Sequence, residues 1–198
     1  MEQENTTLTV SIQSMFAELG IDETHTSKSL ESLSAVDSKY LRDLKLNVAA
    51  VMKSKNLSAR ESALLALAVS VTEKNNVLIT AFENMSRKAE ATAEEIAEAH
   101  ACASLLSLNN VFYRFRHYMH GNEYYNNTPA GIRMSIMMNP VLGKEFFELM
   151  SIVVSAINGC EQCMVSHEHS VKALGTTEPR IYDAVRLGAV IRSLSVIV

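Results

Sequence analysis

Residues 58–71 have the sequence SARESALLALAVSV, and this stretch sets the pattern for the rest of the chain. Ser58 and Glu61 match a capping box, in which each side chain bonds the backbone N–H of the other residue. The run from Ala63 to Val71 that follows is apolar apart from one serine, and it contains neither Gly nor Pro. The stretch therefore predicts a helix that begins at Ser58.

The same pattern returns 85 residues later in the chain, without a gap. The break at Asn75–Asn76 falls where Cys160–Glu161 falls in the second copy. Identical residues at this offset are Leu64 and Leu149, Val69 and Val154, Ser70 and Ser155, Glu83 and Glu168, Thr92 and Thr177, Ile96 and Ile181, and Ala99 and Ala184. Helical sequences share periodicity by accident, but the order of helices and breaks also matches. We interpret the chain as a duplicated helix–turn–helix–turn–helix unit.

The composition indicates an all-α protein. Of 198 residues only 7 are Gly and 3 are Pro, and 47% are hydrophobic, which is enough for a sizeable core. We expect a helical bundle with an internal duplication. Further helices are expected at Val10–Leu19, Asp37–Lys53, Val77–Arg87, Thr92–Leu106 and Val111–His120, with a break at Asn109–Asn110, a loop over Gly121–Pro129 and a last helix opened by Thr177 and Pro179.

The first part of the chain differs in character from the rest. Residues 1–37 are polar and are predicted to form an N-terminal arm with one short helix, which Gly20 would end. Residues 38–198 are predicted to form one helical domain built from two similar halves, the second of which carries the active site.

Charge and hydropathy exclude several classes of protein. The net charge is −4, with 18 Lys and Arg against 22 Asp and Glu, so we expect no nucleic-acid partner. The N-terminus lacks the pattern of a signal peptide, and the longest apolar runs are too short to span a bilayer. Three cysteines are too few for a disulfide-rich secreted domain. We expect a cytoplasmic protein with no membrane partner.

The chemistry is concentrated in the segment from Cys160 to His167. Cys160 follows the break at Asn158–Gly159 and should lie at a helix N-terminus, where unpaired N–H groups stabilise a thiolate. Cys163 lies on the same face, within disulfide range, and His167 lies one turn further on and can take a thiol proton. The helix terminus favours Cys160 as the reactive thiolate and His167 favours Cys163, so spacing alone does not order them.

Glu148 belongs to the preceding helix and can orient His167 only if the two helices pack closely. The duplication provides an internal control for all four candidates. Cys160, Cys163, His167 and Glu148 correspond to Asn75, Leu78, Phe82 and Ala63 in the first copy. Since neutral or apolar residues fill these positions there, the second set is predicted to carry chemistry and not only to pack the unit.

Other interpretations of these residues remain open. The cysteine pair can be two small core residues. It can also be half of a zinc site, with His167 and either His169 or Glu148 as further ligands, although structural zinc sites usually have a second Cys or His pair elsewhere. Cys102 stands alone among Ala and Leu and is predicted to be a core thiol, and the ten Met residues are predicted to fill core and interface.

The segment Asn158–His169, with Cys160, Cys163 and His167 in this spacing, resembles the active-site segment of the AhpD family of alkyl hydroperoxide reductases, within the carboxymuconolactone decarboxylase-like superfamily. The resemblance runs from about residue 38 to the end and includes residues 41–47, 109–114 and 131–134. Glu148 falls at the family's glutamate position. Gln162 stands where some members have a histidine, so an extra proton relay at that position is in doubt.

The resemblance implies an all-helical homotrimer that acts as an antioxidant thiol–disulfide oxidoreductase without a tightly bound cofactor. Dihydrolipoamide, carried on a dihydrolipoamide acyltransferase and recharged by dihydrolipoamide dehydrogenase, would reduce the Cys160–Cys163 pair. The pair would reduce the peroxiredoxin AhpC and, weakly, hydroperoxides. Cys163 would be the attacking thiolate, Cys160 the proton donor and resolving thiol, and Glu148 with His167 the proton relay. Two alternatives are a decarboxylase-like enzyme acting on a lactone acid and a non-enzymatic zinc-binding helical protein.

Overall fold

The computed structural model describes residues 8–198, and within them every regular element is helical, as the sequence predicts. The α-helices are α1 (Val10–Leu19), α2 (Lys28–Ala35), α3 (Lys39–Met52), α4 (Ala59–Thr72), α5 (Asn76–Lys88), α6 (Ala93–Tyr118), α7 (Glu123–Asn127), α8 (Lys144–Ile157), α9 (Glu161–Ala173) and α10 (Glu178–Ser195), with a single 3₁₀ turn at Ser135–Met137. Over this described part of the chain, none of the helices combines the length and the apolar character that crossing a bilayer requires.

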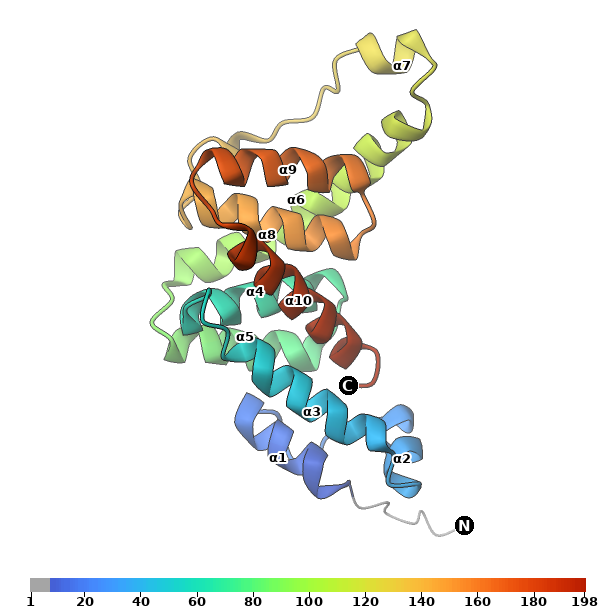
Figure 1. The fold of residues 1–198 in the computed structure, drawn as a ribbon, viewed down its shortest axis with the longest axis vertical. Coiled ribbons are helices and arrows are strands. Elements are labelled where there is room, and N and C mark those ends of the chain that lie inside the picture. Colours follow the sequence, from blue (N-terminus) through green and yellow to red (C-terminus); the bar gives the residue numbers. More distant parts are fainter. Residues whose placement is uncertain (1–7) are drawn as a thin grey trace.

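Figure 1 shows an elongated molecule with α4 near its centre. Helices α5, α6, α8 and α10 all pack against α4. The pair α8 and α9 lies toward one end of the long axis, and α1 and α2 lie toward the other end. The C-terminal part of α6 and the short α7 project beyond the body, and an extended segment leads back from them to α8.

The predicted duplication is visible in the helix bounds. Helix α4 and helix α8 begin at Ala59 and Lys144 and have the same length, and α5 and α9 begin at Asn76 and Glu161 and also match. Helices α6 and α10 begin at equivalent residues, although α6 is longer. The turns match too, because the left-handed residues Lys74 and Glu90 correspond to Gly159 and Gly175. The same backbone path is therefore used twice.

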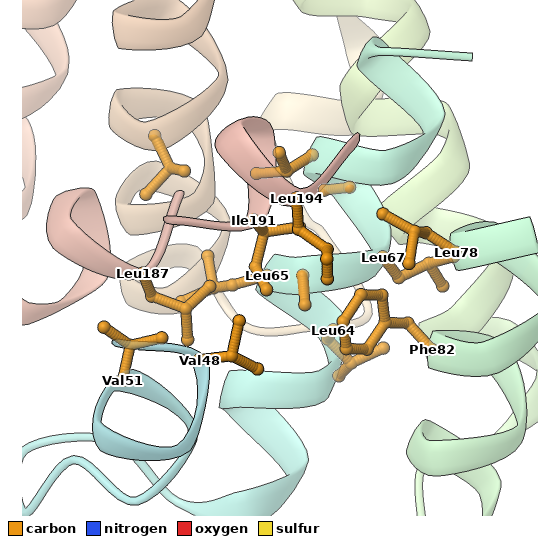
Figure 2. Close-up of a cluster of buried hydrophobic side chains, with 14 of the residues drawn as sticks. Val48, Val51, Leu64, Leu65, Leu67, Leu78, Phe82, Leu187, Ile191 and Leu194 are labelled. Carbon is orange, nitrogen blue, oxygen red and sulfur yellow. The ribbon is translucent and has the colours of Figure 1, made fainter. Parts of the chain in front are cut away.

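The core lies where the two copies meet. Figure 2 shows Leu64 and Leu67 of α4 beside Leu78 and Phe82 of α5, with Ile191 of α10 next to them. All five side chains are fully buried. Large apolar side chains of this kind each contribute about 1.5–3 kcal/mol when removed from water. The apolar run that opens the sequence pattern thus becomes the centre of the molecule.

Side-chain caps fix the helix starts that the sequence predicts. Ser58 and Glu61 form the capping box of α4, and Thr92 and Glu95 form that of α6, with both reciprocal hydrogen bonds present in each case. Helix α1 ends at Gly20, which adopts the left-handed conformation with φ 71°. These caps satisfy N–H and C=O groups that have no partner inside the helix.

Two predictions for residues 107–129 are wrong. The chain does not break at Asn109–Asn110, because α6 continues through both residues to Tyr118. Both asparagines are buried, and the Asn110 amide donates to the Ser155 hydroxyl instead of competing for its own backbone. The predicted loop at Gly121–Pro129 contains the five-residue helix α7, which begins where the side chain of Asn122 caps Tyr125 N–H.

The N-terminal segment holds two helices where one was expected. Helix α1 has the predicted bounds and packs against α3, with Ile12 and Phe16 fully buried. Helix α2 is a further short helix, capped by Ser27. Residues 1–7 of the predicted arm lie outside the described residues. The division into an arm and a two-half domain stays a prediction.

We expect Gly188→Ala to destabilise the protein by about 1–2 kcal/mol. A Cβ atom there would lie 2.5 Å from Val153 Cγ1, and a buried valine is held in one rotamer. Overpacking costs about 1–3 kcal/mol, and the better helix propensity of Ala recovers less than about 1 kcal/mol of it. Thermal unfolding measures the effect. Gly121→Ala is the matched control, since a Cβ atom there meets nothing within 4 Å; equal melting temperatures for the two variants would contradict the prediction.

Candidate active site

The two candidate cysteines form a disulfide at the start of α9. Their Cα atoms lie 5.3 Å apart, and Cys160 is the N-cap residue of the helix. Both residues are buried: Cys160 is 1% exposed and Cys163 is 6% exposed. The sequence therefore placed the pair correctly, on one face of a helix N-terminus and within bonding range.

A tight turn delivers Cys160 to this position. Gly159 has φ 68°, a left-handed conformation that glycine adopts without strain, and the N–H of Cys160 bonds back to the Ser155 carbonyl at 3.0 Å. Two side chains of α6 form hydrogen bonds with this turn. Arg114 donates to the Asn158 carbonyl, and the Asn158 amide donates to the Asn110 oxygen at 2.9 Å. The cysteine pair thus rests on a turn that a second helix fixes in place.

The cap of α9 differs from its counterpart in the first copy. There the Asn75 side chain accepts a hydrogen bond from Leu78 N–H at 3.0 Å. In α9 the N-cap is Cys160, whose side chain makes no capping hydrogen bond, and the equivalent N–H belongs to Cys163. Backbone N–H groups and the helix dipole at this end favour a negatively charged sulfur once the disulfide is reduced.

His167 and Glu148 form a direct hydrogen-bonded pair. The Nδ1 atom of His167 lies 2.6 Å from Oε2 of Glu148, and the two side chains are 12% and 9% exposed. The contact joins α9 to α8, which pack side by side as the prediction for Glu148 required. A carboxylate on Nδ1 fixes the ring orientation and leaves Nε2 for proton transfer. The structure therefore brings all four predicted site residues together on α8 and α9.

A cavity of about 320 Å³ opens beside Cys163. Its lining residues are Asn109, Tyr113, Met134, Met137, Gln162, Cys163, Ser166 and His167. Cys163 and His167 line this cavity and Cys160 does not, so the two sulfurs differ in access although both are buried. A small molecule in the cavity can therefore contact Cys163 but not Cys160.

Several residues that line this cavity are not predicted as site residues from the sequence. Asn109 was interpreted as a helix break, and Met134 and Met137 as core or interface filler, yet all three are cavity wall. Tyr113 lies in α6, within a segment for which the sequence predicts a helix and no site residue. These residues come from α6 and from the segment before α8, so only the tertiary packing unites them with α9. The available signal was the family resemblance over residues 109–114 and 131–134, which include Asn109, Tyr113 and Met134 but not Met137.

The structure also locates the third cysteine and the residues that are candidates for zinc ligands. Cys102 is a free, fully buried thiol, as predicted, and burial raises its pKa to about 12. His169, which was considered as a zinc ligand, is exposed. Over residues 8–198 no three His, Cys, Asp or Glu side chains are grouped so that they could hold a metal ion. The geometry gives the zinc alternative no support.

Comparison with known proteins agrees with the motif. The family model described as carboxymuconolactone decarboxylase family matches residues 39–113 and 125–195. The chain is 39% identical over 155 residues to alkyl hydroperoxide reductase AhpD of Anaeromyxobacter dehalogenans (strain 2CP-C), covering 78% of this chain and 82% of that protein. It is 35% identical over 168 residues to the protein of that name from Streptomyces coelicolor, covering 85% and 93%. For the Azorhizobium caulinodans protein the identity is 36%, covering 85% and 92%. The chain therefore belongs to the carboxymuconolactone decarboxylase family, and over most of its length it is similar to members named alkyl hydroperoxide reductase AhpD.

Proposed function

We propose that the protein is a thiol-dependent peroxidase and disulfide reductase whose working centre is the Cys160–Cys163 pair. One observation carries the proposal: a disulfide at a helix N-terminus presents Cys163 to a cavity that it shares with His167, and His167 is oriented by Glu148. Dithiol, base and orienting carboxylate are the parts that thiol–disulfide exchange requires. The names of the similar proteins favour the same chemistry.

In the oxidative half-reaction the reduced pair consumes a hydroperoxide. His167 takes the proton of Cys163, and the thiolate attacks the distal oxygen of the hydroperoxide, so that an S–O bond forms and the O–O bond breaks. The imidazolium returns its proton to the departing alkoxide, which leaves as the alcohol. The Cys160 thiol then attacks the sulfenic sulfur, water leaves, and the disulfide closes.

In the reductive half-reaction dihydrolipoamide opens the disulfide. One of its thiolates attacks Cys163, the sulfur that lines the cavity, and Cys160 departs as the leaving thiolate at the helix N-terminus. The second thiol of the donor then attacks the donor sulfur that is bonded to Cys163. Cys163 leaves as the thiolate, which gives oxidised lipoamide and the protein dithiol. The apolar wall formed by Tyr113, Met134 and Met137 suits the hydrocarbon arm and ring of the donor.

The physiological partners follow from the same proposal. The dithiol reduces the disulfide of the peroxiredoxin AhpC, and a lipoyl-bearing dihydrolipoamide acyltransferase, recharged by dihydrolipoamide dehydrogenase, supplies electrons. The protein acts as a cytoplasmic homotrimer. The projecting end of α6 and helix α7 carry exposed Tyr118 and Tyr124, which is the character of surface that subunit contacts use. Sedimentation analysis tests the trimer, and a monomer would contradict it.

Thiol counting by alkylation and intact mass tests the proposed function directly. After dihydrolipoamide treatment, we expect two thiols per native chain to be labelled, because Cys102 is buried and its pKa is raised to about 12. If the reduced protein is treated with one equivalent of an organic hydroperoxide before alkylation, neither thiol should be labelled, and fresh dihydrolipoamide added before alkylation should restore both. Two labels under every condition would show an inert pair and sink the proposal.

The two alternatives make different predictions. A decarboxylase acting on a lactone acid has no need of a dithiol, so its activity would survive the loss of both cysteines. A zinc protein purified without chelator would carry one zinc ion per chain, which elemental analysis detects. Among residues 8–198, no contact favours either alternative over thiol chemistry.

A further inference from the structure

One buried amide in the wall of the cavity has hydrogen-bonding capacity that the protein does not use. Asn109 is only 4% exposed, and within residues 8–198 its buried Oδ1 atom has no hydrogen-bond partner. Its Nδ2 atom donates only to the thioether sulfur of Met134, a weak acceptor. Turning the amide over would exchange the roles of the two atoms and leave the capacity unused in the same way. A buried polar group without a good partner costs stability and calls for a physical explanation.

The neighbouring asparagine shows how a structural amide behaves in this helix. Asn110 donates to Ser155 Oγ at 2.9 Å and accepts from Asn158 Nδ2 at 2.9 Å, so both ends of its amide are bonded to protein. It fixes the turn before Cys160. Asn109, one residue away, holds no turn and joins no such network. The two residues therefore do different things although they are adjacent and equally buried.

The internal duplication supplies a second, independent observation. Position 109 of α6 corresponds to Leu194 of α10, which is fully buried in the core. The repeat accepts a leucine at this position, so packing does not demand an asparagine. As with Cys163, His167 and Glu148, a residue with a functional group stands in the copy where the cavity lies, and an apolar residue stands in the other copy. Asn109 thus follows the same pattern as these three site residues.

We propose that Asn109 is a substrate-binding residue, which hydrogen-bonds the peroxide oxygens of an organic hydroperoxide held against Cys163. The inference deepens the proposed function and rests on it. An amide carries both a donor and an acceptor, and R–O–O–H has a donor on its distal oxygen and an acceptor on its proximal one. The thiol groups of dihydrolipoamide are only weak hydrogen-bonding partners, so at the reacting atoms the amide matches the hydroperoxide better than the dithiol. The flexible side chain of Met134 can move aside when the substrate enters.

The hydrogen bond gains strength during the reaction. As the Cys163 thiolate attacks the distal oxygen and the O–O bond breaks, the electron pair passes to the proximal oxygen. The Asn109 N–H then faces a developing alkoxide until His167 supplies the proton that releases the alcohol. A donor aimed at the atom where charge develops stabilises the transition state more than the bound substrate. Asn109 thereby acts on the peroxide and leaves the thiolate unchanged.

The test compares Asn109→Leu with Leu108→Ala, because Leu108 is the neighbouring residue of α6, is exposed and does not line the cavity. Prereduced protein is mixed with cumene hydroperoxide, and the second-order rate constant of Cys163 oxidation is measured. Asn109→Leu should lower this constant about 10–100-fold, the usual effect of losing a hydrogen bond to a developing charge. Leu108→Ala should change it less than about threefold. The rates of Cys163 alkylation by iodoacetamide and of disulfide reduction by dihydrolipoamide should stay unchanged in both variants.

The outcomes separate this inference from the proposed function. If wild-type protein fails to react with the hydroperoxide, the proposed function itself falls. If wild type reacts and Asn109→Leu reacts as fast, the role of Asn109 is wrong while the function stands. An equal loss in hydroperoxide and iodoacetamide rates also overturns the inference, because Asn109 would then act through the thiolate. Circular dichroism melting checks folding, and the leucine found at the equivalent position makes a folded variant the expected result.

Discussion

Cys163→Ser is expected to abolish hydroperoxide reduction and lipoamide-dependent turnover entirely. A serine hydroxyl does not ionise near neutral pH and cannot form a disulfide, so neither half-reaction has a route around this residue. Cys163 also lines the cavity, whereas Cys160 does not. Coupled peroxidase assays with dihydrolipoamide as donor measure the effect. Full hydroperoxide turnover by Cys163→Ser would remove thiol chemistry from the protein.

Cys160→Asn is the informative companion of that variant. The first copy has Asn75 at this position, where it caps the helix, so the replacement restores a proven cap and should leave the fold intact. Cys163 should still react once with a hydroperoxide and stop as the sulfenic acid, because no resolving thiol remains. Mass spectrometry should show one oxygen added per chain and no disulfide. If Cys160→Asn, treated with hydroperoxide in the absence of a thiol donor, gains no oxygen, then Cys163 does not react as proposed.

Local spacing explains why so much of the fold and site could be predicted. Helix starts are set by residues three apart, as in the capping boxes of Ser58 and Thr92, and these appear in the sequence without any tertiary knowledge. The duplication then fixes the backbone, because the two copies share helix bounds and left-handed turn residues. Cys160, Cys163 and His167 are likewise joined by one helix, so their spacing alone places them on one face.

The remaining features depend on contacts between distant segments. Asn109 and Asn110 favour turns by local propensity, but burial against α8 and the segment before it overrides that preference and keeps α6 continuous. The cavity wall combines α6, α9 and the segment that contains Met134 and Met137. Only the packing of these elements shows which of the ten Met residues face the site. Glu148 lies between these two cases. The sequence identifies it as a candidate, but its contact with His167 depends on how closely α8 and α9 pack.

The duplication also explains how a reactive site can occupy a stable bundle. The first copy shows that the unit folds with a capped helix and apolar side chains at the equivalent positions. In the second copy the cap becomes a cysteine, and two buried apolar positions become the His167–Glu148 pair. Functional sites commonly give up local stability in this way while the surrounding structure maintains the fold. Replacing each site residue by its counterpart is therefore a mutation that removes chemistry and keeps the architecture.

His167→Phe is the second change for which we expect a large effect. Phe82 fills the equivalent position, so the replacement fits the unit, but the thiol of Cys163 loses its base. Loss of a general base typically slows a reaction about 10²–10⁴-fold, and hydroperoxide turnover should fall within that range. The rate should then rise with pH, because without the base a larger share of Cys163 becomes thiolate only as the solution becomes more alkaline. A rate equal to wild type at neutral pH would exclude His167 from the mechanism.

The single variant also leaves Glu148 buried without its partner, and an unpaired buried carboxylate destabilises a fold by several kcal/mol unless it takes up a proton. The double variant Glu148→Ala with His167→Phe removes both groups and recreates the Ala63 and Phe82 arrangement of the first copy. We expect it to melt at a higher temperature than His167→Phe while it stays equally slow toward hydroperoxide. Stability and activity would then change independently. The fold is stable when both members of the Glu148–His167 pair are present or both are absent, whereas catalysis requires that His167 is present. Recovery of activity in the double variant would show that the slow rate of the single variant arises from misfolding and not from the missing base.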